Sequence, residues 1–238
     1  MQFEIAGDRD PFLLVRLNKG ETVYSESGAM VSMDAVLDLE GEVRGGLLGA
    51  LARKFVAGES LFTQKIYAAR GNGEVLLAPA MPGDIHILEV GAQQYILNDG
   101  AFLAAETSVD LKMKMQGIGQ AIFGGTGGLF VVETTGHGKV AVGGFGSVFG
   151  LEVEPGQTLI IDNQHVVAWD SRLRYDIGYR TSASKGFLGN LISSQTSGEG
   201  LITKFSGTGK VYLSSRNFEQ LKKMMGISPQ KGGVSQYA

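Results

Sequence analysis

The sequence predicts an all-β fold built from three internal repeats. A glycine-bracketed strand pattern, Gly-x-Gly-[Glu/Lys]-Val-x-[Leu/Val], occurs at 71–77, 136–142 and 207–213. Apolar and polar residues alternate at 36–43 and 109–115, which is typical of half-buried strands. Glycine contributes 36 of the 238 residues, about twice the usual share, and we expect it mainly in turns.

A second pattern repeats in step with the glycine-bracketed strand. An apolar run ending in an acid occurs at 29–34, 101–106 and 165–170. Within these runs the aromatic residues Phe102 and Trp169 are predicted to lie in the core. A glycine stands four residues before a strand residue in each copy, and the pairs are Gly20 and Tyr24, Gly91 and Tyr95, and Gly156 and Ile160.

These patterns divide the chain into three β repeats at 1–86, 87–150 and 151–216. The glycine pairs Gly71/Gly73 and Gly136/Gly138 are expected to supply positive-φ residues for tight turns. A short helix and a flexible tail are predicted at 217–238. Asn217 can cap this helix and Gly226 can end it.

Each repeat also contains a glycine-framed apolar segment, at 45–58, 117–125 and 186–194. The first and third have helical spacing and predict short helical turns. The three apolar segments either cap the cores of their repeats or form a contact surface for a second subunit, a partner protein or a membrane surface. The residues of this predicted contact surface are Leu47, Leu48, Leu51, Phe55, Ile118, Ile122, Phe123, Phe187, Leu188 and Ile192.

Composition excludes several functional classes. The net charge of −3 leaves no basic excess for nucleic-acid phosphates, so no nucleic-acid partner is expected. The absence of cysteine excludes a disulfide framework, a zinc finger and a thiol nucleophile. No Gly-x-Ser-x-Gly elbow or phosphate-binding glycine loop is present, so neither an enzymatic activity nor a cofactor is expected. The first eleven residues lack the apolar core of a signal peptide, which favours a cytoplasmic location.

The candidate metal ligands are the histidines and three acids at equivalent positions of the repeats. His86, His137 and His165 lack the closely spaced pair that a metal site on one strand uses, so no metal site is expected from them. If the repeats surround an axis, Asp34, Glu106 and Asp170 can converge and bind a cation. Alternatively, each acid accepts backbone N–H bonds at a strand end or pairs with a nearby Arg or Lys.

The first apolar segment, followed by Gly58-Glu-Ser-Leu-Phe62 and by Leu77-Ala-Pro79 with Pro82-Gly83-Asp84, resembles one known family. This is the altered-inheritance-of-mitochondria family, also catalogued as TRAP-like proteins of unknown function, and the resemblance covers nearly the whole chain. It implies three β-sandwich units of a shortened double-stranded β-helix type around a pseudo-threefold axis. It carries over no catalytic residue. The family's mitochondrial members are linked to membrane-organising complexes, and this chain looks more like the bacterial branch.

The function expected from the sequence is a non-enzymatic binding or scaffold protein. It is expected to form a homo-oligomer or to contact a protein partner or a membrane surface through the apolar segments. The alternative is a small-ligand or metal-binding β-barrel module.

Overall fold

The computed structural model describes residues 1–43, 62–115, 130–179 and 201–226. Within these ranges the chain folds into strands β1–β19, the 3₁₀ turn η1 (Asn163–His165) and the C-terminal helix α3 (Phe218–Met224), so the all-β prediction is confirmed. The strands form four separate sheets, and none of these closes into a barrel. The predicted helical turns in the first and third apolar segments lie outside the described residues.

All strand neighbours within the sheets are antiparallel. The first sheet has the order β1 (Gln2–Ala6), β2 (Phe12–Leu17), β7 (Gly73–Leu77), β4 (Met30–Met33). The second sheet has the order β5 (Asp38–Val43), β6 (Phe62–Tyr67), β3 (Thr22–Glu26), β10 (Phe102–Glu106), β13 (Gly138–Gly143), β8 (Ile85–Val90).

The third sheet has the order β11 (Val109–Met115), β12 (Phe130–Gly136), β9 (Tyr95–Asn98), β16 (Val166–Asp170), β19 (Gly209–Ser214), β14 (Val148–Val153). The fourth sheet has the order β15 (Thr158–Asp162), β18 (Leu201–Ser206), β17 (Arg174–Tyr179). The two six-stranded sheets therefore each join strands from consecutive predicted repeats.

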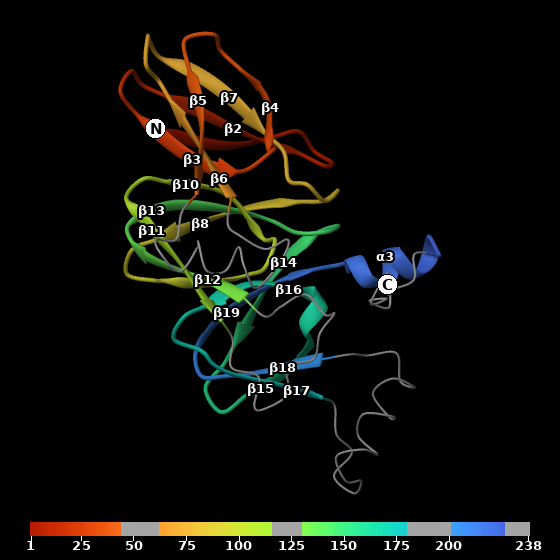
Figure 1. Cartoon of the computed structure of the whole chain (residues 1–238). Helices are drawn as coiled ribbons and strands as arrows, with labels where there is room; N and C mark the ends of the chain where they lie inside the picture. Colours follow the sequence, from red (N-terminus) through yellow and green to blue (C-terminus); the bar gives the residue numbers. More distant parts are fainter. Residues whose placement is uncertain (44–61, 116–129, 180–200, 227–238) are drawn as a thin grey trace, which may run out of the picture.

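The four sheets are stacked in a row, from the N-terminal sheet at one end to the fourth sheet at the other (Figure 1). One apolar core lies between each pair of consecutive sheets. Val15, Val23 and Ile66 belong to the first core, Leu97 and Val140 to the second. The third contains the predicted core residue Trp169, and Phe102 lies in the second, with 2% and 5% of their surfaces exposed. Because alternate residues of a strand face opposite sides, both faces of the two middle sheets are buried.

The same strand pairing occurs three times, with the same register and the same bulge. The pairs β4·β7, β10·β13 and β16·β19 each contain a register shift after their first residue pair. The residue skipped by the shift is Val31 in β4, Leu103 in β10 and Val167 in β16. These are the positions that the sequence aligns, so the repeated motifs occupy matching positions in the pairings.

The second glycine of each glycine-bracketed strand is the first residue of a strand. Because it has no side chain, it leaves room for the side chain of a neighbouring residue. A Cβ on Gly73 would lie 2.9 Å from Leu37, and one on Gly209 would lie 2.9 Å from Asp170. The prediction of positive φ is right for Gly136 and Gly138, with φ of 92° and 129°. It is wrong for Gly71 and Gly73, because the first of these turns needs glycine for close packing and not for its backbone conformation.

The predicted repeat limits at 86/87 and 150/151 fall inside strands β8 and β14. Strand β8 pairs with β13 of the predicted second repeat, and β14 pairs with β19 of the predicted third repeat. A closed arrangement around a threefold axis would bring β4 of the first sheet beside β15 of the fourth. Among the described strands these two lie in separate sheets at the two ends of the stack, so the pseudo-threefold axis is not confirmed (Figure 1).

The residues that precede β8 form a glycine-rich contact with the residues that precede β14. The Asp84 amide donates to the Gly146 carbonyl at 2.8 Å, and the Asp84 carboxylate accepts from the Val148 amide at 3.0 Å. Gly83 has φ of 154°, and a Cβ there would lie 2.0 Å from the Gly144 carbonyl oxygen. This position therefore admits only glycine without a shift of the backbone.

Gly83→Ala is expected to lower the free energy of unfolding by about 2–3 kcal/mol, because the added methyl group collides with backbone atoms. Urea titration followed by circular dichroism measures the change. Gly41→Ala in β5 is the matched control, since a Cβ at Gly41 meets no atom within 4 Å. Equal stability of the two variants would contradict this account of the contact.

Candidate functional site

The predicted contact surface lies within 44–61, 116–129 and 180–200, outside the described residues. The strands that flank these segments are described. Each segment joins two neighbouring antiparallel strands at their last residue pair: Val43 opposite Phe62, Met115 opposite Phe130, and Tyr179 opposite Leu201. The three apolar segments therefore leave the sheets from matching hairpins, β5·β6, β11·β12 and β17·β18.

The structure describes Asp34, Glu106 and Asp170 and does not bring them together. No three His, Asp or Glu side chains in the described ranges are placed to hold one metal ion. Asp34 accepts a hydrogen bond from the Glu74 amide at 2.9 Å. Each acid lies beside the glycine-bracketed strand of its own predicted repeat, so the three acids do not form a cation site, and Asp34 and Asp170 have local partners.

Asp170 is the most enclosed of the three acids, with none of its side chain exposed. Arg172 donates to it from its backbone amide at 2.9 Å and from its guanidinium at 2.6 Å, and the Gln93 amide donates at 2.8 Å. Burial raises the pKa of Asp170, but the hydrogen bonds and charge of Arg172 outweigh burial and leave the pKa below its ordinary value.

The three histidines lie apart in the structure. His137 is exposed in the turn between β12 and β13. His86 packs on the ring of Tyr212 at 4.7 Å, and burial followed by the charge of Lys210 lowers the pKa of His86.

His165 fastens helix α3 to the stack of sheets. Its Nδ1 lies 2.7 Å from the Ser214 carbonyl and therefore donates, which leaves Nε2 to accept from the Asn217 side-chain amide at 3.0 Å. The Asn217 Oδ1 accepts from the Gln220 amide at 2.8 Å and caps the helix, which confirms the predicted helix start. The sequence marked the cap, but nothing in it marked His165 as its partner.

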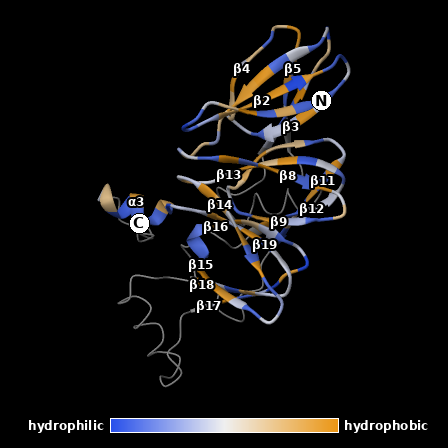
Figure 2. Cartoon of the chain, turned by 180° about the vertical axis from the view of Figure 1, so that it is seen from behind, coloured by the Kyte–Doolittle hydropathy of each residue, from blue (hydrophilic) through white to orange (hydrophobic). Residues whose placement is uncertain are grey.

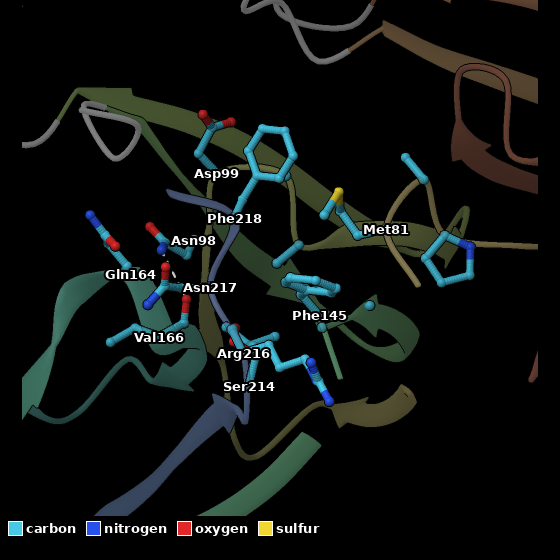
Figure 3. Close-up of a pocket in the computed structure, with 17 residues that line it drawn as sticks. Met81, Asn98, Asp99, Phe145, Gln164, Val166, Ser214, Arg216, Asn217 and Phe218 are labelled. Atoms are coloured by element: carbon cyan, nitrogen blue, oxygen red, sulfur yellow. Dashed lines mark hydrogen bonds between the residues drawn. The ribbon is translucent and has the colours of Figure 1, made fainter. Parts of the chain in front are cut away.

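A small cleft lies beside this junction (Figure 3). Asn98, Gln164, Ser214, Arg216 and Asn217 contribute polar groups to its wall. Several of these groups serve the junction itself: the Asn98 amide donates to the Val166 carbonyl at 2.8 Å and the Ser214 hydroxyl to the Arg216 carbonyl at 2.9 Å. The cleft encloses about 140 Å³. This is below the roughly 300–1,000 Å³ of pockets that hold drug-sized ligands.

Helix α3 carries large apolar side chains that the rest of the described chain does not cover. Phe218 is 47% exposed, Met224 85% and Met225 54%, and no residue of the helix is buried. The helix projects sideways from the stack of sheets (Figures 1 and 2). The helix therefore presents an apolar surface, while its first turn is held by the hydrogen bonds of Asn217.

Comparison with known proteins identifies relatives over most of the chain. A family model described as "Mitochondrial biogenesis AIM24" matches residues 3–216. An uncharacterized protein of Streptococcus pyogenes serotype M6 is 42% identical over an alignment of 216 residues that covers 88% of this chain and 83% of that protein. A protein of Streptococcus pyogenes whose crystal structure is known is 38% identical to this chain, and the two structures align with a TM-score of 0.76 over 94% of this chain and 98% of that one. No helix in the described part of the chain is long and apolar enough to cross a membrane.

Arg172→Ala is expected to lower the free energy of unfolding at neutral pH by about 1–3 kcal/mol, because buried Asp170 loses its main partner. The pKa of Asp170 is depressed in the folded state, so its contribution is present above the unfolded-state pKa and is lost as pH falls through the folded-state pKa. The deficit of the variant should therefore shrink in acid. Denaturant titration at several pH values measures it.

Lys139→Ala is the control for the arginine variant. Lys139 pairs at 3.7 Å with Glu89, which is 73% exposed, so its removal should cost less than about 1 kcal/mol. A deficit for Arg172→Ala that is independent of pH would contradict the role given to Asp170.

Asn217→Ala is expected to loosen helix α3 by about 1 kcal/mol, because the helix loses its cap. Hydrogen exchange of the Leu221 and Met225 amides measures this local opening, since both donate within the helix. Asn217→Asp keeps the capping oxygen and removes the donor to His165, so it separates the cap from the junction. Unchanged exchange in Asn217→Ala would show that the cap does not hold the helix.

Proposed function

The chain belongs to the AIM24 family, and we propose that it is a non-enzymatic binding or scaffold protein that acts by self-association or by contact with a partner. The proposed contact elements are the three apolar segments, supported by the exposed apolar side chains of helix α3.

The proposal treats the chain as three tandem β units. The shared register and bulge of β4·β7, β10·β13 and β16·β19 support this division. Cross-strand ion pairs recur at one position in the three units, and these are Arg16 with Glu74, Lys139 with Glu89, and Lys210 with Glu152. With strand pairing as a guide, the units begin before β8 and before β14.

The observation that carries the proposal is the attachment of the three apolar segments to matching hairpins. The segments are far apart in the sequence, yet each connects the strands of one hairpin at its last residue pair. A turn of two to five residues suffices for such a connection, whereas these connections contain 18, 14 and 21 residues. Connections with apolar segments at three equivalent points are thus longer than the strand pairing requires, and long connections are suited to binding.

Leu48→Asp and Phe187→Asp are expected to change the mass of the protein in solution, or its binding to a surface, while leaving the β fold intact. A charge in an apolar contact opposes desolvation and breaks the association. Sedimentation velocity measures the mass. Co-sedimentation with vesicles of phosphatidylcholine and an anionic phospholipid tests a membrane surface.

Ser194→Asp places the same charge at a polar position of the third apolar segment and serves as the control. Far-ultraviolet circular dichroism tests the fold of each variant. Unaltered mass and unaltered vesicle binding in both apolar variants would count against the proposal. Loss of the fold would indicate instead that the segments cap the cores.

A further inference from the structure

Consecutive units are connected twice by the same kind of strand pairing, β10 with β3 and β16 with β9, and each of these pairings is called a joint below. In the second sheet Ala104, Ala105 and Glu106 of β10 lie opposite Ser25, Tyr24 and Val23 of β3. In the third sheet Ala168, Trp169 and Asp170 of β16 lie opposite Leu97, Ile96 and Tyr95 of β9. Each joint thus pairs the bulged strand of one unit with the first strand of the hairpin sheet of the unit before it.

The corresponding strands at the two ends of the stack have no such partner among the described strands. Strand β4 is the first unit's equivalent of β10 and β16, and it is an edge strand of the first sheet. Strand β15 is the third unit's equivalent of β3 and β9, and it is an edge strand of the fourth sheet. The chain therefore ends in two open edges that are complementary to each other.

The side chains at these edges are exposed where their equivalents are buried. Val31 in β4 is 53% exposed, whereas Leu103 and Val167 are 1% and 4% exposed. Ile160 in β15 is 60% exposed, whereas its equivalent Ile96 is 5% exposed. Leu103 and Val167 are buried because they pack into the core of the preceding unit. No unit of the described stack packs on Val31 in this way.

The open edges also lack the charges that keep free edges apart. A charge within an edge strand discourages pairing with another chain. Strand β4 contains no charged residue, and the only one in β15 is Asp162, at its end, which accepts from the Gln164 amide at 3.0 Å. The other edge strands of the described sheets all carry interior or leading charges: Glu4 in β1, Asp38 and Glu40 in β5, Glu89 in β8, Asp110 and Lys112 in β11, Glu152 in β14, and Arg174 and Asp176 in β17.

We propose that β4 of one chain pairs with β15 of a second copy, in the antiparallel register of the two internal joints. That register places Met33 opposite Ile160 and Ser32 opposite Ile161 of the second copy. The first sheet of one chain and the fourth sheet of the next then form one continuous sheet, β1-β2-β7-β4 followed by β15-β18-β17. The second copy covers Val31 as the preceding unit covers Leu103 and Val167.

The contact is head-to-tail, because it uses two different surfaces of the chain. Such a contact closes into a ring or continues as an open filament, depending on the rotation between copies. The pairing rests on the self-association proposed above, but it uses sheet edges and not the apolar segments.

Single cysteines test the pairing, since the chain contains none of its own. Residues directly opposite in an antiparallel pair have Cα atoms about 4.5–5.5 Å apart, within the range that a disulfide spans. Met33→Cys chains are mixed with Ile160→Cys chains carrying a different tag and are mildly oxidised. We expect a linked two-chain product with both tags. Ser32→Cys with Ile161→Cys probes the adjacent pair, which has the alternate hydrogen-bonding geometry.

Phe149→Cys mixed with Met33→Cys is the control, because Phe149 is 66% exposed on the edge strand β14, which has no complementary edge. Val31→Lys added to the Met33→Cys chain should abolish the linked product. Linkage equal to that of the Phe149→Cys control in both cysteine pairs would overturn the proposal. An internal disulfide in a single chain carrying Met33→Cys and Ile160→Cys would also overturn it, because the chain would then close on itself.

The same mixing in a Leu48→Asp background separates this inference from the proposed function. Linkage should persist there, since β4 and β15 lie outside the apolar segments. If linkage fails in every background while Leu48→Asp still changes the mass in solution, the edge pairing is wrong and the proposed function stands.

Discussion

Backbone pairing between neighbouring units is the interaction on which this structure depends. Strands β10 and β16 each lie between a strand of their own unit and a strand of the unit before, so their amide and carbonyl groups are satisfied on both sides. This pairing joins strands of the three proposed units into two six-stranded sheets, and both faces of each sheet are buried. The apolar cores depend on this pairing, because each core lies between two consecutive sheets.

Side chains near the strand ends fix the register of these pairings. Asp34 accepts from the Glu74 amide, and Asp170 accepts from the Arg172 amide. Gly209 leaves room for the Asp170 side chain, and Gly73 leaves room for the Leu37 side chain. The bulge after the first residue pair turns Leu103 of β10 and Val167 of β16 toward the core of the preceding unit. A residue that is buried in the second and third units, as Leu103 is, becomes the exposed Val31 in the first.

The strands and the C-terminal helix could be predicted from the sequence because alternation, the glycine pairs and the Asn217 cap act locally. The sheet order could not, since it depends on which unit supplies the neighbouring edge. Spacing from Gly91 also aligned Tyr95 with Tyr24. Strand pairing aligns Ile96 with Tyr24 instead. Ile96 lies opposite Glu133 of β12, Tyr24 lies opposite Lys65 of β6, and Glu133 and Lys65 are equivalent positions of these two strands. The candidate cation site failed for the same reason: equivalent acids at matching positions in a row of units stay apart, whereas around an axis they would converge.

The proposed pairing of β4 with β15 makes the ends of the stack complementary edges of the kind already joined within the chain. Sedimentation of the unmodified protein over a range of concentrations tests this self-association. We expect species of two or more copies of the 25.3 kDa chain, whose share rises with concentration. A single species of 25.3 kDa at every concentration would contradict it.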